Sequence, residues 1–314
     1  MKLPIERQIS LIETPGFAGY GLIDSGNGRK LERFGAIVVD RPEPQALWQP
    51  ALGAQAWAKA HAVFSASGED DEKGRWRVDR PVPDSWPVEA GRATMLCRLQ
   101  GLWHLGLFPE QYPHWQWMRG EIDRVAAAGP DRRPRVLNLF AYTGAASLVA
   151  AAAGAEVTHV DASKKAVAWA RENQKASELG EAPIRWIVDD ATKFVAREVR
   201  RERQYDVILV DPPKFGRGPA GETWDLFTHL GPLLSDCERL LAPGPSAMVL
   251  TVYAIRASAL AFGQLLAQTL DKRTGTIDVG ELAIREQSGR FAVPTSLFVR
   301  WSSSRTGNHV PEAT

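Results

Sequence analysis

The segment Asp211-Pro212-Pro213-Lys214-Phe215 follows an apolar run, YDVILV, that is typical of a buried β-strand. Two consecutive prolines have no backbone N–H, so the segment ends the strand and projects its side chains outward. The Asp211 carboxylate and the proline carbonyls are acceptors that can orient an amino or hydroxyl group of a substrate. Phe215 can stack on a base and Lys214 can contact a phosphate. Phe215 can equally well be a core residue, and Lys214 can equally well be a solvated lysine with no contact to a substrate.

Three other strand-like runs end in residues that suit the same kind of site. Gly144 stands where the first run turns into a helix, and its missing Cβ either lets the backbone approach a ligand or only permits the turn. Asp161 ends the second run and can accept both hydroxyls of a ribose, or cap a helix, for which Ser163 is also a candidate. Asp190 ends the third run and can accept from an adenine amine, or be a cap or a solvated acid. Because ligands bind outside the carboxyl ends of parallel strands, this succession predicts one ligand site.

These segments lie in the second part of the chain, where strand-like and helix-like runs alternate. The expected strands are 135–140, 156–161, 184–190, 205–211, 246–254, 276–287 and 296–302, and the expected helices are 109–129, 145–154, 163–180, 191–202, 224–241 and 257–271. Such alternation predicts an α/β fold with a mostly parallel sheet covered on both faces. The last two strands are joined too closely for a crossover and should pair antiparallel.

The first of these helices should turn Trp117, Ile122 and Val125 inward and end at Gly129. Before it, short strand-like runs at 20–25, 34–40, 74–78 and 93–101 alternate with turn signals, and one helix is expected within 50–64. We therefore expect two domains. Residues 1–107 form a smaller, mainly β N-terminal domain, and residues 108–314 form the α/β domain.

Composition limits the function less than the motifs do. Hydrophobic residues make up 44% and charged residues 24% of the 314 residues, with a formal net charge of +1, so composition favours neither nucleic acid nor a membrane surface. The most apolar run is far shorter than the roughly 20 residues of a membrane span, and the N-terminus has no signal-peptide core. Two distant cysteines suit a reducing compartment, and no histidine has a second ligand at metal spacing. We expect a soluble cytoplasmic protein without a metal site.

The motifs NLFAYTG, VDAS, DDA and DPPKFGRG together resemble those of the class I S-adenosylmethionine-dependent methyltransferases. More narrowly, the chain resembles the ribosomal-RNA large-subunit methyltransferase group, whose members carry an F-x-Y-T-G turn and a D-P-P-K-F motif. The resemblance covers roughly residues 100–305. It implies a Rossmann-like seven-stranded sheet with an antiparallel C-terminal hairpin, S-adenosyl-L-methionine as cofactor, and ribosomal RNA as the partner. The N-terminal domain would then assist substrate binding.

The resemblance also implies roles for individual residues. The cofactor site would be lined by residues at the strand ends and by one residue of FPEQYPHW: Phe140, Ala141, Tyr142, Thr143, Gly144, Asp161, Ser163, Asp190, Asp211 and Gln111. Within this set Asp161 would bind the ribose and Asp190 the adenine. The catalytic group would be Asp211 and Pro212 beside the reactive methyl group, with Lys214 and Phe215 addressed to the substrate. Glu110 and Gln111 match an acid–Gln pair of related enzymes.

One departure from the group concerns the nucleophile. Methylation of cytosine C5 requires a cysteine that attacks C6. In the resembling group this cysteine follows the fifth strand, where the present chain has Tyr253 and Ala254. Cys237 falls on an expected helix with apolar spacing, and Cys97 belongs to the N-terminal domain, so both are expected to be buried packing residues. Methylation of a nitrogen or an oxygen therefore fits better.

Three functional hypotheses follow from these observations. The first is an S-adenosylmethionine-dependent methyltransferase that acts on ribosomal RNA or another nucleic acid, with Arg217 and Arg256 as candidates for phosphate contact. The second is a methyltransferase for a small molecule or a protein. The third is a protein that binds the cofactor or RNA without catalysis. A nicotinamide-dependent dehydrogenase is disfavoured because the first turn has a lone glycine rather than G-x-G-x-x-G.

Overall fold

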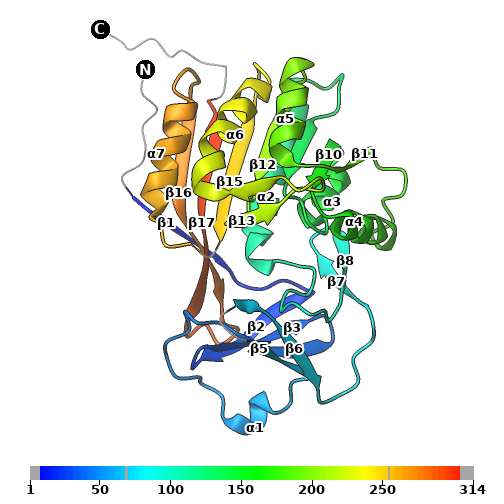
Figure 1. Ribbon diagram of the computed structural model, residues 1–314, viewed down its shortest axis with the longest axis vertical. Coiled ribbons are helices and arrows are strands. Elements are labelled where there is room, and N and C mark those ends of the chain that lie inside the picture. Colours follow the sequence, from blue (N-terminus) through cyan, green and yellow to red (C-terminus); the bar gives the residue numbers. More distant parts are fainter. Residues whose placement is uncertain (1–7, 68–69, 254, 305–314) are drawn as a thin grey trace.

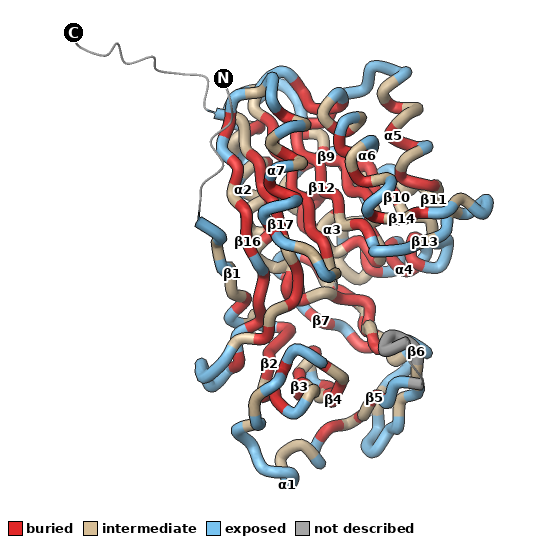
Figure 2. Tube along the Cα trace, turned by 60° about the vertical axis from the view of Figure 1, so that its left-hand side comes forward, coloured by how far each residue is buried: buried red, intermediate tan, exposed pale blue. Residues whose placement is uncertain are grey.

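The computed structural model describes residues 8–67, 70–253 and 255–304. Figure 1 shows a large sheet flanked by helices above a smaller group of strands, which come from the N-terminal part of the sequence. The strands of the large sheet are largely buried, whereas the outer surfaces of the flanking helices are exposed (Figure 2). This layering is the architecture that the alternation of strands and helices predicts.

The large sheet has eight strands in the order β1-β16-β17-β15-β12-β9-β10-β11. Their bounds are Ser10–Thr14 (β1), Arg135–Leu139 (β9), Glu156–Asp161 (β10), Ile184–Val188 (β11), Val207–Val210 (β12), Ala247–Tyr253 (β15), Gly275–Arg285 (β16) and Ala292–Ser303 (β17). Strands β9, β10, β11, β12 and β15 are parallel, and β17 pairs antiparallel with β16, as expected, and also with β15. The carboxyl ends of the parallel strands therefore meet at one edge of the sheet.

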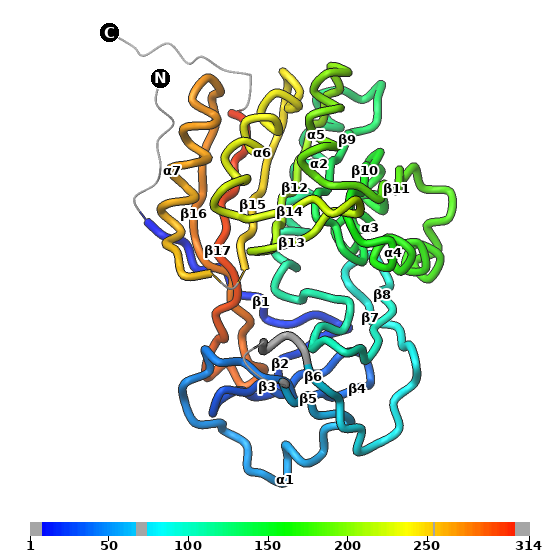
Figure 3. Tube along the Cα trace, in the orientation of Figure 1, coloured from blue at the N-terminus to red at the C-terminus, as the bar shows by residue number. Residues whose placement is uncertain are grey.

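The eighth strand, β1, was not predicted. It pairs in parallel with β16 although the two are far apart in the sequence, so the blue and orange segments lie side by side in Figure 3. Ser10 is opposite Gly280, where an added Cβ would lie 1.9 Å from the Ser10 carbonyl oxygen. Only glycine permits this close approach of the two backbones. The N-terminal segment thus completes the edge of the large sheet.

The helices divide between the two faces of this sheet. They are Tyr112–Ala128 (α2, preceded by the 3-10 turn η1, Pro109–Gln111), Ala145–Ala152 (α3), Lys164–Ala176 (α4), Ala191–Arg200 (α5), Leu226–Leu240 (α6) and Ala259–Thr269 (α7). Val136 packs with α2 and α3, whereas its neighbour Leu137 packs with α5, α6 and α7. Successive side chains of a strand point to opposite faces, so one apolar run serves both layers. None of the described helices is both long and apolar enough to cross a membrane.

The inward face of α2 differs from the expectation in one residue. Trp115, Met118, Ile122 and Val125 are buried, and Ile122 and Val125 were predicted. Trp117 is only partly buried, with its ring 5.3 Å from the Arg300 guanidinium. The buried positions follow the 3.6-residue period, and position 117 falls off their line. The helix ends as predicted at Gly129, whose N–H donates to the Val125 carbonyl oxygen.

The N-terminal strands form a second sheet and a separate hairpin. The five-stranded sheet contains Tyr20–Gly26 (β2), Arg29–Phe34 (β3), Ile37–Pro42 (β4), Ala62–Ser67 (β5) and Asp70–Val78 (β6), and the hairpin contains Trp86–Ala90 (β7) and Ala93–Cys97 (β8). The hairpin lies against α4: the Leu96 N–H donates to Asn173 (2.8 Å) and the Trp169 indole donates to the Leu96 carbonyl (2.8 Å).

The helix expected within residues 50–64 is a wrong prediction for most of its length. Only Ala54–Trp57 forms a helical turn (α1), and none of its residues is buried. Ala62 and Phe64 instead point into the protein from strand β5, with the alternating burial of a strand. Pairing with β6 and burial of these two side chains outweigh the local helical preference, which is weak in such a short segment.

The buried face of α2 leads to a prediction for stability. Substituting Met118, which is fully buried, with alanine should lower the free energy of unfolding by about 2–5 kcal/mol, because a cavity replaces the side chain. Asp123→Ala is the matched control on the exposed side of the same helix and should change stability by no more than about 0.5 kcal/mol. Urea unfolding followed by circular dichroism measures both. Equal stabilities of the two variants would contradict the assigned face.

Candidate active site

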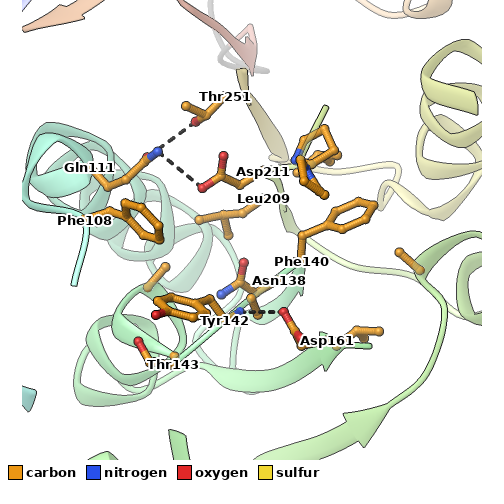
Figure 4. A pocket seen from close by; sticks show the side chains of 18 of the residues that line it. Phe108, Gln111, Asn138, Phe140, Tyr142, Thr143, Asp161, Leu209, Asp211 and Thr251 are labelled. Carbon is orange, nitrogen blue, oxygen red and sulfur yellow. Dashed lines mark hydrogen bonds between the residues drawn. The ribbon is translucent and has the colours of Figure 1, made fainter. Parts of the chain in front are cut away.

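A cavity of about 460 Å³ opens at the carboxyl ends of the parallel strands (Figure 4). Among its lining residues are eleven of the residues singled out in the sequence: Gln111, Phe140, Ala141, Tyr142, Thr143, Gly144, Asp161, Ser163, Asp190, Asp211 and Pro212. Lys214 and Phe215 are not among them. The strand order brings these residues together, because β9 lies between β12 and β10, and β10 lies beside β11.

The turn from β9 into α3 has an unusual backbone. Phe140, Tyr142 and Gly144 all have positive φ angles, of 56°, 50° and 88°. Left-handed conformations are costly for residues with a Cβ and persist only where the surroundings enforce them. At Gly144 an added Cβ would also lie 3.0 Å from the Ala170 Cβ, so glycine is required for the turn itself. The turn brings the backbone of this segment to the cavity wall.

Thr143 fixes this turn to the segment that joins the N-terminal strands to α2. Its hydroxyl donates to the Gly106 carbonyl oxygen (2.6 Å), and its own carbonyl accepts from the Asn173 amide (2.9 Å). The neighbouring Tyr142 ring lies 5.3 Å from Phe108, measured between ring centroids. The Thr143 hydroxyl is therefore occupied within the protein, and its contribution to the cavity wall is structural.

Asp161 stands at the end of β10 with its carboxylate directed to the cavity. One oxygen accepts from the Tyr142 N–H and the other from the Ser163 N–H, both at 2.8 Å. Burial raises the pKa of Asp161, and these two hydrogen bonds oppose the rise. Each oxygen keeps a second acceptor site for a ligand. Ser163 caps α4 as predicted, because its hydroxyl accepts from the Ala166 N–H (3.2 Å).

Asp190 is a helix cap that also lines the cavity. It is the N-cap of α5, where its carboxylate accepts from the Lys193 N–H (3.0 Å) and from the Thr192 hydroxyl. The neighbouring Asp189 forms an ion pair with Arg197. The capping role that the sequence left open for Asp190 is thus confirmed, and the carboxylate remains at the cavity wall.

Asp211, at the end of β12, faces the cavity from the opposite side. Its carboxylate accepts from the Gln111 amide (3.3 Å), whose oxygen accepts in turn from the Thr251 hydroxyl (3.4 Å), as the dashed lines of Figure 4 show. Burial, followed by repulsion from the Glu110 carboxylate, raises the pKa of Asp211 to about 7. Pro212 is buried behind it. Asp211 can thus exchange a proton near neutral pH.

Lys214 and Phe215 lie outside the cavity, on a short hairpin of β13 (Phe215–Arg217) and β14 (Thr223–Asp225). Phe215 is 63% exposed, and the Lys214 ammonium lies 5.1 Å from its ring centroid. The interpretation of Phe215 as a core residue is therefore wrong. Trp224 takes the buried place: its indole N–H donates to the Pro213 carbonyl oxygen (2.7 Å), and its ring lies 4.9 Å from that of Phe140.

Trp224 and Thr251 line the cavity, but the sequence analysis did not assign them to the site. Trp224 was expected to begin the helix 224–241; it lies instead in β14, before Asp225, the N-cap of α6, and only its large aromatic ring could have marked it. Thr251 lies inside the apolar strand β15, where a single polar residue in a buried run was the available signal.

The described residues bring no cysteine side chain to the cavity. Cys97 and Cys237 are buried as predicted, and neither lines the cavity. Burial raises the pKa of both thiols, that of Cys97 to about 12. Tyr253 lines the cavity where the cysteine of related enzymes would be expected, and Ala254 lies outside the described residues. No three His, Cys, Asp or Glu side chains of the described chain form a group that could hold a metal ion.

Comparison with a solved structure decides the family. The S-adenosylmethionine-dependent methyltransferase from Agrobacterium tumefaciens is 46% identical, with a TM-score of 0.91, and the match covers 96% of each chain. This chain belongs to the S-adenosylmethionine-dependent methyltransferases. The methyltransferase fold expected from the motifs is thereby confirmed, with β1 added to the seven predicted strands. A putative methyltransferase from Streptococcus mutans shares the fold at 17% identity and a TM-score of 0.66.

Curated relatives and one family model match only part of this methyltransferase. The ribosomal RNA large subunit methyltransferase K/L of Hahella chejuensis is 36% identical over 141 residues, and that of Alcanivorax borkumensis is 32% identical over 183 residues. These matches cover 44% and 55% of the chain but only 18% and 22% of those proteins. The chain thus spans about a fifth of the length of these relatives. The family model described as "Conserved hypothetical protein 95" matches residues 122–231.

The tie between Thr143 and Gly106 leads to a second prediction. Thr143→Val should lower the free energy of unfolding of the methyltransferase by about 1–3 kcal/mol, because the buried Gly106 carbonyl loses its donor. Thr143→Ser retains the hydroxyl and should lose much less. Urea denaturation compares the two variants. If Thr143→Ser were as unstable as Thr143→Val, the hydrogen bond from residue 143 to Gly106 would not be the source of the stability.

Proposed function

We propose that this methyltransferase transfers a methyl group from S-adenosyl-L-methionine to a nitrogen or oxygen atom of ribosomal RNA or another nucleic acid, without a cysteine nucleophile. The observation that carries the proposal is the position of Asp211. Its acceptor carboxylate faces the same cavity as the Phe140–Gly144 turn and Asp161. The names of the curated relatives, which are ribosomal RNA methyltransferases, support the choice of RNA.

The residues present suit this cofactor. The Asp161 carboxylate has free acceptor sites for the two hydroxyls of a ribose. Asp190 and Ala191, at the start of α5, line the part of the cavity that would receive the adenine, and the turn from Phe140 to Gly144 would line the methionine end. Thr143 and Ser163 would contribute wall atoms, since their hydroxyls are already bonded within the protein.

The chemistry would require little more from the protein than positioning. The bound cofactor supplies an electrophilic methyl group: the acceptor atom uses its lone pair to bond the methyl carbon, and the electrons of the broken S–CH₃ bond stay on sulfur. Asp211 would accept a hydrogen bond from the acceptor and then take up the proton that it loses. Pro212, buried beside Asp211, would keep that carboxylate at the cavity wall.

The hairpin of β13 and β14 would contact the rest of the nucleic acid. Phe215 is exposed for stacking on a base, and Lys214 and Arg217 are exposed beside it for phosphate contact. Residues 1–107 would assist substrate binding as an N-terminal domain, and residues 108–314 would hold cofactor and reaction site. Such a function would place the protein in the cytoplasm.

The first test concerns the cofactor. Asp161→Ala should weaken S-adenosylmethionine binding about 10²–10⁴-fold, because two hydrogen bonds to a charged group are lost and each contributes roughly 1.5–3 kcal/mol. Isothermal titration calorimetry measures the affinity, with the exposed Asp271→Ala as a control that should bind normally. Equal affinities of Asp161→Ala and the unaltered protein would contradict the assignment of Asp161 to ribose binding.

The second test concerns the acceptor. Cofactor labelled in its methyl group should transfer label to ribosomal RNA from cells that lack this protein, and not to RNA from cells that have it. Asp211→Asn should reduce this transfer by about 10²–10⁴-fold, the usual contribution of a proton-accepting group. Label in protein or in small molecules but not in RNA would favour those substrates. If the protein binds the cofactor but transfers label to none of RNA, protein and small molecules, it would be a binding protein without catalytic activity.

A further inference from the structure

A chain of two hydrogen bonds fixes the orientation of the Asp211 carboxylate. An ionised carboxylate can only accept, so the Gln111 amide must turn its NH₂ group toward Asp211, 3.3 Å away. The Gln111 oxygen then faces Thr251, whose hydroxyl must donate to it over 3.4 Å. All three side chains line the cavity, and they come from three different elements: β12, η1 and β15 (Figure 4). These hydrogen bonds occupy one Asp211 oxygen and, within the part of the chain that the structure describes, leave the other free.

Glu110, the residue before Gln111, has the opposite effect on Asp211. The Gln111 hydrogen bond favours the ionised carboxylate, whereas Glu110 disfavours it. Glu110 is only 6% exposed and lines the same cavity, and its own backbone N–H helps to stabilise the ionised carboxylate. It also lines a smaller cavity of about 20 Å³, where Lys30 and Arg41 are the nearby cations. Burial raises the pKa of Glu110, and these two cations oppose the rise.

Both cations are committed to other carboxylates. The Lys30 ammonium lies 3.1 Å from Glu43, and the Arg41 guanidinium lies 2.7 Å from Glu32 and also donates to the Trp103 carbonyl oxygen. Glu110 therefore has no ion-pair partner of its own among the described residues. When Glu110 is ionised, its negative charge disfavours ionisation of Asp211.

We propose that Glu110, Gln111 and Thr251 are positioning residues for Asp211. Gln111 and Thr251 hold its carboxylate with one oxygen free for the acceptor, and the charge of Glu110 favours uptake of the proton that the acceptor loses. The proton balance is that of the proposed function, on which this inference rests: the acceptor atom keeps the electron pair of its N–H or O–H bond as it bonds the methyl carbon, and Asp211 carries the proton to water. Glu110 and Gln111, which are adjacent in the sequence, thus shift the pKa of the Asp211 carboxylate in opposite directions.

Two histidines and two tyrosines near Asp211, Glu110, Gln111 and Thr251 are uncharged and do not change this electrostatic balance. Burial lowers the pKa of His104 to about 3 and that of His114 well below its usual value, so both rings are neutral. Burial raises the pKa of Tyr142, and that of Tyr20, which donates to Glu32, so both remain protonated.

The remaining charged groups of the larger cavity are bonded elsewhere or exposed. Asp161 accepts from two backbone N–H groups, Asp189 is paired with Arg197, and Asp190 caps α5. Arg217 is exposed on β13, and Tyr253 lines the wall at the end of β15. Of these groups, Glu110 is the one whose charge raises the pKa of Asp211.

The test follows the titration of Asp211 itself, so that it does not depend on activity. Protein labelled with ¹³C at the aspartate carboxyl carbon is titrated by NMR, and the Asp211 signal is the one that disappears in Asp211→Asn. The unaltered protein should titrate with a pKa of about 7. Glu110→Gln should lower this value by on the order of one unit, because the repelling charge is removed. Thr251→Val and Gln111→Ala should raise it, because the ionised form loses its donor or the donor's orientation.

Matched variants separate these effects from general damage to the fold. Thr251→Ser keeps the hydroxyl and should restore the original titration, and Thr269→Val removes a hydroxyl that bonds within α7 and should leave it unchanged. Where methyl transfer is measurable, the acidic limb of kcat/KM should move with the NMR value in each variant. Shifts of the same sign in Glu110→Gln and Thr251→Val, or none in either, would overturn the inference. The expected shifts without any methyl transfer would uphold it and count against the proposed function.

Discussion

The left-handed turn at Phe140, Tyr142 and Gly144 is the constraint around which the rest of the site is arranged. A turn with two non-glycine residues at positive φ is stable only if many contacts enforce it. Asp161 holds it from β10 through the Tyr142 N–H, and Gly106 holds it from the N-terminal side through the neighbouring hydroxyl. Helix α4 and the β13–β14 hairpin close the remaining sides. The proposed ribose-binding carboxylate is therefore also part of the support for the turn, which couples the cofactor half of the cavity to the integrity of the fold.

Several contacts join the N-terminal strands to the site. Strand β1 completes the large sheet, β8 is hydrogen-bonded to α4, and the connection through Gly106 and Phe108 packs on the turn. This connection continues directly into Glu110 and Gln111, which reach Asp211. Buried ion pairs of the five-stranded sheet, such as that of Arg41 with Glu32, lie beside the small cavity that Glu110 lines. Changes in the N-terminal sheet thus have a short physical route to the proposed proton acceptor.

Local patterns in the sequence were sufficient for the strands and helices of the α/β part and for the residues at the strand ends, because periodicity and parallel topology are enough to place them. They were insufficient wherever a long-range contact decides the outcome. Burial of Ala62 and Phe64 in a sheet overrode a helical pattern, and the pairing of β1 depends on a glycine 270 residues further along the chain, at position 280. Trp117 was expected to face inward with Ile122 and Val125, whereas the helical period of the buried residues selects Trp115. The link from Gln111 to Asp211 spans 100 residues and leaves no local trace.

The DPPKF motif divides into two parts that face different surroundings, and this division bears on how it would work. Asp211 and Pro212 lie at the cavity, whereas Lys214 and Phe215 lie outside it on an exposed hairpin. Pro213 separates the two parts, and its carbonyl is fixed by the buried ring of Trp224, which in turn packs on the strained turn. A base held at Asp211 and a flanking nucleotide stacked on Phe215 would therefore be joined by one short connection, whose Pro213 carbonyl is bonded to Trp224. The two prolines restrict the backbone of this connection, because each ring limits its own φ angle.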